Sequence, residues 1–166
     1  GVDLVQVEKR SSLLSNDSAS VDDAVFDYFK LYTTDYNVCC IYATNVLLKP
    51  STLISSYEKF LENPNSSLMG VSKYKYKIHK AMLMNESGYL RSLFPEHSKL
   101  KTQELHDTYV SNGTFYWSTT SLINECSSLL TSNMRGFLVP EEEVCDLDEL
   151  SDLEELYKRM NQKVVI

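Results

Sequence analysis

The chain alternates stretches with apolar residues at helical spacing and short, continuous apolar runs. Helical spacing predicts helices in four places, within residues 20–33, 49–65, 118–133 and 150–160. Continuous apolar runs are typical of strands buried on both faces of a parallel sheet, and they occur at residues 37–44, 67–74, 114–118 and 136–140. This order of elements predicts an α/β three-layer sandwich with a mostly parallel sheet.

Local signals support the first two helices. Ser20 is followed three residues later by Asp23, which is the pattern of a capping box at a helix start. Pro50 falls in the first turn of the second predicted helix, and the stretch 63–65 (Asn-Pro-Asn) ends it. A helix between the strands at 37–44 and 67–74 predicts a right-handed crossover connection.

Residues 75–108 do not follow either period. They are polar, carry several lysines and histidines, and contain the turn sequence Asn-Glu-Ser-Gly at 85–88. We interpret this stretch as an excursion from the sheet, a hairpin and arm within a single domain that spans residues 1–166. It is either a surface arm packed on its own domain or an arm that reaches a second subunit.

The stretch 141–156 holds nine carboxylates, and two of them, Asp146 and Asp148, flank a single leucine. In an extended segment alternate side chains share a face, so these two aspartates would point the same way. Paired carboxylates of this kind are ligands for a hard cation such as Mg²⁺. The alternative is a solvated lead-in to a helix, capped by Ser151 with Glu154.

The overall charge limits the partners. The 166 residues hold 16 Lys+Arg against 23 Asp+Glu, a net charge of −7, which argues against a binder of nucleic-acid backbones or of membrane surfaces. No apolar run approaches the length of a membrane span. The four cysteines show no spacing typical of a metal site or a disulfide framework, so a reducing, cytoplasmic location is expected.

In open α/β sheets, ligands bind beyond the carboxyl ends of the strands. The candidate positions are therefore residues 42–49 and 73–80, which follow the first two predicted strands, together with 109–113 and 146–148. Polar residues are concentrated there. None of the three histidines lies at catalytic spacing from a serine or cysteine, so the sequence gives no support to hydrolase chemistry.

Several motifs resemble those of the acylneuraminate cytidylyltransferases, most closely the branch that acts on pseudaminic acid. They are CCIYATNVLLKPSTL, VSKYKYKIHKAM, FPEHSKLKTQELHDTYVSNGTFYW, VCDLDELSDLEELY and KRSSLLSNDSASVDDAV. The likeness covers nearly the whole chain, in the family's order. Lys77 stands where the branch usually has proline, and Lys101 where it usually has arginine. The strand and basic, glycine-rich CTP loop with which the family begins have no counterpart in these 166 residues, so we expect an N-terminally truncated domain.

The resemblance implies a Rossmann-like nucleotidyltransferase fold and a definite reaction. Such a protein would transfer CMP from CTP to a nonulosonic (acidic nine-carbon) sugar and release pyrophosphate, generally as a homodimer joined through the arm at 75–108. Asp146 and Asp148 would hold the catalytic Mg²⁺. A non-catalytic sugar-binding or scaffold domain of the same fold is the alternative, because the CTP loop is missing.

The resemblance also implies substrate contacts. They would come from Thr44, His79, Lys101, Gln103 and Asn112. Each has an ordinary structural interpretation as well: Thr44 can hydrogen-bond its own turn, and Lys101 can be a solvated surface lysine. The dipeptide Asn112–Gly113 is in itself a strong turn signal.

Overall fold

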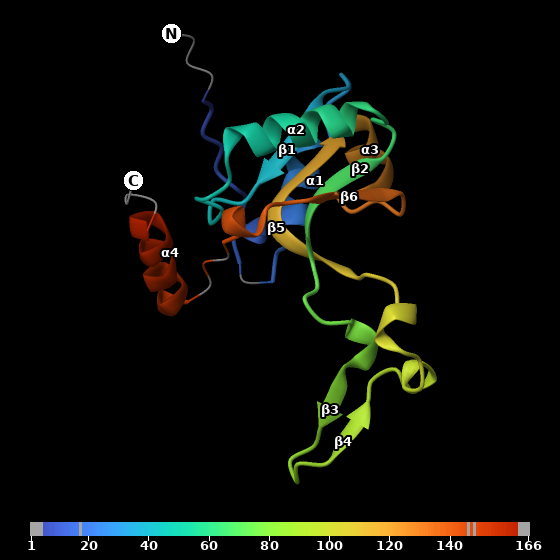
Figure 1. Ribbon diagram of the computed structural model, residues 1–166. Helices are drawn as coiled ribbons and strands as arrows, with labels where there is room; N and C mark the ends of the chain where they lie inside the picture. Colours follow the sequence, from blue (N-terminus) through green and yellow to red (C-terminus); the bar gives the residue numbers. More distant parts are fainter. Residues whose placement is uncertain (1–4, 17, 146, 148, 163–166) are drawn as a thin grey trace. The chain divides into compact units, whose positions relative to one another are not determined.

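The computed structural model describes residues 5–16, 18–145, 147 and 149–162 (Figure 1). The helices are α1 (Val21–Phe29), α2 (Pro50–Leu61), α3 (Thr120–Cys126) and α4 (Leu150–Gln162). The strands are β1 (Asn37–Ile41), β2 (Ser67–Lys73), β3 (Met82–Met84), β4 (Leu90–Ser92), β5 (Tyr109–Thr119) and β6 (Met134–Leu138). The described chain also holds five short 3-10 helices: η1 precedes α1, and η2 to η5 lie between the other elements.

The chain divides into two compact units. The first unit holds the residues up to Tyr42, Lys49–Met69 and Phe115–Phe137. The second unit holds Ala43–Leu48, Gly70–Thr114 and the residues from Leu138 onward. Strands β2, β5 and β6 each pass from one unit into the other along the chain.

The main sheet has the strand order β1-β5-β2-β6. β1 and β5 are antiparallel, with Asn37 opposite Thr119. β5 is also antiparallel to β2, because Ser67 at the start of β2 contacts Ser118 near the end of β5, with 3.1 Å between their hydroxyl oxygens. β5 therefore lies between β1 and β2 in the sheet, although β1 and β2 are consecutive strands along the chain.

β6 runs parallel to β2. Ser66 donates from its hydroxyl to the carbonyl of Asn133 at 2.6 Å, and further along both strands the amide of Val139 donates to the carbonyl of Val71 at 3.1 Å. Three strands (β1, β2 and β6) thus share one direction and β5 opposes them. The fold is the predicted α/β class, with a mixed sheet whose strands are mostly parallel.

In the first unit, helices cover both faces of the sheet. On one face, α1 and α3 pack on the apolar cluster of Val38, Tyr116, Ile123 and Leu129. On the other face α2 packs against Trp117, whose ring stacks on that of Phe60 with centroids 6.0 Å apart. Neighbouring residues of β5 point to opposite faces, so Tyr116 and Trp117 serve different layers. The three-layer arrangement follows (Figure 1).

Local chemistry fixes the two long helices of this unit. Ser20 accepts from the amide of Asp23, and Asp23 accepts from the amide of Ser20, so the predicted capping box is formed at the start of α1. α2 begins at Pro50, as predicted, because proline lacks only an N–H that the first turn leaves unpaired. None of the helices in the described chain has the length and apolarity needed to span a bilayer.

In the second unit, residues 75–108 form the predicted excursion, and β3 and β4 pair as an antiparallel hairpin in which Met82 lies opposite Ser92. A single lysine organises the segment that follows this hairpin. The ammonium of Lys80 donates to the carbonyls of His97, Ser98 and Leu100 at 2.6–3.1 Å. We call residues 75–108 the arm.

Candidate functional site

All the predicted site residues that the structure describes belong to the second unit. Thr44 lies in the loop after β1, where its carbonyl accepts from the amide of Val46 at 3.0 Å, as in an ordinary turn. Its neighbour Asn45 is 9% exposed and donates from its side-chain amide to the carbonyl of Gly113 at 2.7 Å. The side-chain oxygen of Asn45 has no hydrogen-bond partner among the described residues.

Asn112 and Gly113 do not form a hairpin turn, so that prediction was wrong. They lie within β5, where Gly113 has a φ of 65° and interrupts the regular strand. The side-chain oxygen of Asn112 accepts from the hydroxyl of Thr114 at 2.7 Å, and its amide donates to the hydroxyl of Ser72 at 3.2 Å. Thr44 and Asn112 are therefore linked through Asn45 and Gly113.

Gly70 on β2 allows β5 to come this close. A Cβ at Gly70 would lie 2.1 Å from the hydroxyl oxygen of Thr114 and 3.0 Å from the side-chain oxygen of Asn112. Only a residue without a side chain fits there. The position of Asn112 thus depends on Gly70.

The arm holds the other predicted contacts. The ring of His79 packs edge-on against His97 with centroids 4.8 Å apart, and its Nδ1 is buried without a hydrogen-bond partner among the described residues. Lys101 and Gln103 are exposed at the short 3-10 helix η4 (Thr102–Glu104). The amide of Lys101 donates to the carboxylate of Glu104 at 2.6 Å, so its backbone is fixed while its ammonium faces solvent.

Two lysines share one carboxylate where the arm leaves β2. The ammonium groups of Lys73 and Lys77 each lie 2.5 Å from an oxygen of Asp107. Hydrogen bonds from Lys73 first, and then Lys77, lower the pKa of Asp107 to about 2, and the same contact raises the pKa of Lys73. Asp107 and Lys73 therefore stay charged across the physiological range and hold the two ends of the arm together.

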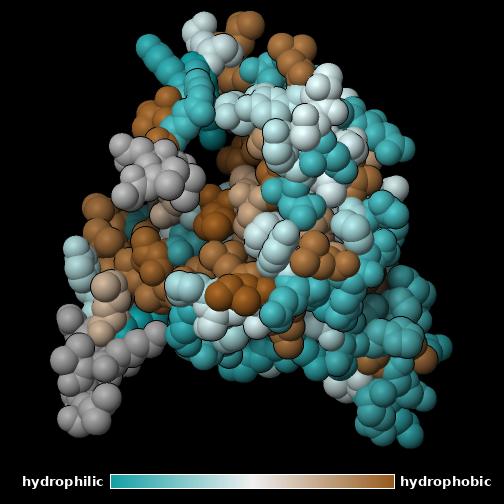
Figure 2. Space-filling view, turned by 90° about the horizontal axis from the view of Figure 1, so that it is seen from above, coloured by the Kyte–Doolittle hydropathy of each residue, from teal (hydrophilic) through white to brown (hydrophobic). Residues whose placement is uncertain are grey.

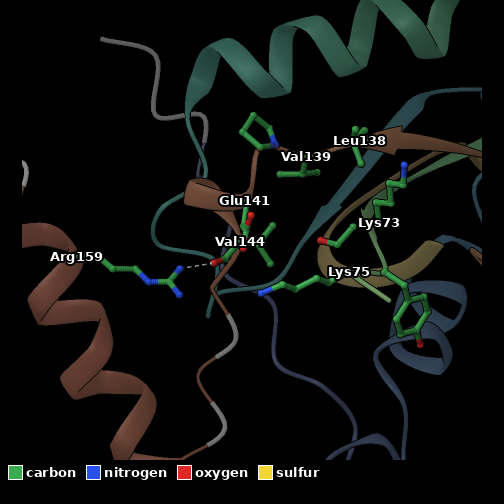
Figure 3. A pocket seen from close by; sticks show the side chains of 10 residues that line it. Lys73, Lys75, Leu138, Val139, Glu141, Val144 and Arg159 are labelled. Atoms are coloured by element: carbon green, nitrogen blue, oxygen red, sulfur yellow. Dashed lines mark hydrogen bonds between the residues drawn. The ribbon is translucent and has the colours of Figure 1, made fainter. Parts of the chain in front are cut away.

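A cavity of about 860 Å³ lies beside Lys73, at the ends of β2 and β6 (Figure 3). Three cationic side chains line it, from Lys73, Lys75 and Arg159, together with one carboxylate, from Glu141. Ser72, the partner of Asn112, also lines it. The cavity is thus connected by hydrogen bonds to the loop that carries Thr44.

The acidic stretch follows the cavity along the chain. Asp146 and Asp148, the predicted metal ligands, lie outside the described residues. Among the residues that the structure describes, no group of three or more His, Cys, Asp or Glu side chains could hold a metal ion. The predicted Ser151 capping box does not form: α4 begins at Leu150, so Ser151 lies within the helix, and Asp152 accepts from the amide of Glu149 at 2.7 Å.

The fold is an α/β fold with a mixed, mostly parallel sheet, as in Rossmann-like nucleotidyltransferases, and polar residues gather at its strand ends. The chain is similar to the pseudaminic acid cytidylyltransferases of Campylobacter jejuni subsp. jejuni serotype O:23/36, at 32% identity over 149 residues, and serotype O:2, at 31% identity over 149 residues. These matches support the assignment to the cytidylyltransferase family made from the sequence motifs. Each alignment covers 87% of this chain, which spans 64% of the length of either relative. No protein-family model matches the chain.

Sequence reasoning missed several residues of this region. Asn45 is buried and links the loop after β1 to β5, but an asparagine after a strand ordinarily indicates only a turn. Asp107 was not singled out because its partners Lys73 and Lys77 lie 34 and 30 positions away along the chain. Arg159 was not recognised as a cavity residue, because a basic residue near the end of a helix ordinarily interacts with the helix dipole.

Proposed function

We propose that this chain belongs to an enzyme that transfers CMP from CTP to a nonulosonic acid of the pseudaminic type. The observation that carries the proposal is the 32% identity over 149 residues to a pseudaminic acid cytidylyltransferase. In this reaction a sugar hydroxyl oxygen attacks the α-phosphorus of CTP. The bond to the β-phosphate breaks, pyrophosphate leaves, and the hydroxyl proton passes to solvent or a base.

Asp146 and Asp148 are the proposed ligands for Mg²⁺. Carboxylates suit this ion, which keeps several positions for substrate phosphates and water. When bound, it would offset negative charge on the reacting phosphates. The proposal for these two ligands rests on the resemblance of the segment VCDLDELSDLEELY to the family's acidic motif.

The polar residues around the second unit's strand ends suit binding and orientation of substrate. The unpartnered oxygen of Asn45 is an acceptor for a ligand hydroxyl or N–H, since a buried polar atom otherwise loses free energy. Asn112 is held by Thr114 and Ser72, so it is pre-positioned. Thr44, His79, Lys101 and Gln103 stay predicted substrate contacts.

The test of the metal assignment is a pair of variants, Asp146→Asn and Asp148→Asn. Each is expected to lower Mg²⁺-dependent pyrophosphate release by on the order of 100-fold. Thermal stability should not fall, because neutralising one of two nearby carboxylates removes repulsion. Glu154→Gln, an exposed carboxylate of α4, is the matched control and should keep wild-type activity. Full activity in both aspartate variants would refute the assignment.

A homodimer joined through the arm belongs to the same proposal. The arm exposes large apolar side chains, with Tyr76 77%, Met84 71% and Tyr89 75% exposed. Figure 2 shows exposed apolar residues among polar ones on the face in view. A two-stranded hairpin with three-residue strands is marginal by itself, so a second copy of the arm would stabilise it.

Light scattering after size-exclusion chromatography tests the dimer. Met84→Asp with Tyr89→Asp should convert a dimeric mass into a monomeric one, because burying two carboxylates in an apolar interface is costly. Leu13→Asp, at a residue 80% exposed outside the arm, should leave the mass unchanged. A monomeric wild-type protein at micromolar concentration would contradict the proposed dimer.

A second candidate is a domain that binds the acidic sugar but transfers no nucleotide. Such a domain would not need a glycine-rich phosphate loop, and these 166 residues hold none. A cytoplasmic location fits either candidate, since no two of the four cysteines are joined by a disulfide.

A further inference from the structure

The charges that line the cavity of the second unit are not equally available to a ligand. Lys73 is paired with Asp107 at 2.5 Å. Arg159 donates to the carbonyl of Val144 at 3.1 Å and lies 3.3 Å from the carboxylate of Glu155 on the same helix. Both of these cations are therefore already held by acceptors of the protein.

Lys75 is different. Its ammonium lies 5.8 Å from the ring centroid of Tyr76, and among the described residues no carboxylate lies within ion-pair distance of it. Figure 3 shows its side chain extending from the end of β2 toward the side of the cavity formed by Glu141 and Val144. Lys75 is therefore the cavity's available cation.

The rest of the lining selects against a highly charged ligand. Leu138, Val139, Pro140 and Val144 give the cavity an apolar wall, and Glu141 adds a negative charge. A triphosphate carries several negative charges and would meet one uncommitted lysine and one repelling carboxylate. A ligand with a single carboxylate and a larger neutral body fits one cation beside an apolar wall.

We propose that this cavity binds the acidic sugar and that Lys75 pairs with the sugar's carboxylate. This inference rests on the proposed function, which supplies the acidic sugar as a substrate. Lys75 would then be a specificity residue, because a neutral sugar would leave its ammonium without a partner. Lys73, fixed by Asp107, would shape the cavity and contribute less to binding.

Calorimetric titration tests the inference with the whole chain. The probes are pseudaminic acid, its methyl ester, and CTP with Mg²⁺. Lys75→Gln should weaken binding of the acid by on the order of tenfold, the loss expected for a charge-assisted hydrogen bond, and leave CTP binding unchanged. Lys75→Arg should restore most of the affinity, and wild type and Lys75→Gln should bind the methyl ester equally.

The control is Lys99→Gln, at an exposed lysine of the arm that does not line the cavity. Wild-type affinity for the acid in Lys75→Gln would overturn the inference and leave the proposed function standing. A loss confined to CTP would also overturn it, because the cavity would then serve the nucleotide. A folded wild-type chain that binds neither the acid nor CTP would contradict the proposed function, and this inference with it.

Discussion

Substituting Gly70 by alanine tests how the sheet positions the candidate site. The new Cβ would lie 2.1 Å from the hydroxyl oxygen of Thr114, whereas ordinary contacts begin near 3.4 Å, so one of the two atoms must move by 3.4 − 2.1 = 1.3 Å. Thr114 is fully buried and cannot turn toward solvent. A negative φ at Gly70 means that the clash, not backbone strain, sets the cost.

The expected loss of stability in Gly70→Ala has two parts. Forcing an extra methyl group into a packed site costs about 1–3 kcal/mol. Displacing Thr114 also breaks its 2.7 Å hydrogen bond to Asn112, which adds about 1 kcal/mol. The expected loss in the free energy of unfolding is therefore about 2–4 kcal/mol, or a Tm lower by roughly 5–15 °C for a chain of this size.

Urea unfolding followed by circular dichroism measures this loss. Gly88→Ala is the comparison: nothing lies within 4 Å of its Cβ, but its φ of +82° makes alanine unfavourable by about 1–2 kcal/mol through strain alone. Adding Thr114→Ala should recover stability in the Gly70 variant and not in the Gly88 variant. A Gly70→Ala protein within about 0.5 kcal/mol of wild type would refute the reasoning.

Two further predictions concern titration. Because the pKa of Asp107 in the folded protein is lowered to about 2, the stability from its ion pairs is present above the pKa of the unfolded chain and is lost as pH falls toward 2. Urea midpoints should thus fall more steeply in wild type than in Asp107→Asn between about pH 4 and 2, and equal slopes would contradict this. Burial raises the pKa of Cys39 to about 12, so iodoacetamide at pH 8 should label exposed Cys126 and spare Cys39 in a mass-spectrometric digest. Labelling of Cys39 in folded protein as fast as Cys126 would be inconsistent with that burial.

Features set by neighbouring residues could be predicted from the sequence. The capping box of Ser20 and Asp23 and the start of α2 at Pro50 are confirmed, because both depend on contacts within one helical turn. The buried face of α2 could be predicted only in part. Ser56 faces the sheet because Trp117 donates to it at 2.8 Å, while Ile54 is 60% exposed. Apolar periodicity does not reveal a partner 61 positions away.

The pairing of strands that are distant along the chain could likewise not be predicted from the sequence. The insertion of β5 between β1 and β2 depends on strand pairing across the chain, and it places Asn112–Gly113 within a strand where local chemistry favours a turn. Thr44 and Asn112 lie on segments that are joined by one hydrogen bond, from Asn45 to the carbonyl of Gly113. The assignments of His79, Lys101 and Gln103 stay predictions, as does the metal pair of Asp146 and Asp148.

The most direct test of the proposed CMP transfer is pyrophosphate release by the 166-residue chain with CTP, pseudaminic acid and Mg²⁺. We expect release that requires all three components and is lost when any one of them is left out. A folded chain that binds pseudaminic acid but releases no pyrophosphate would contradict the transferase and favour the sugar-binding domain.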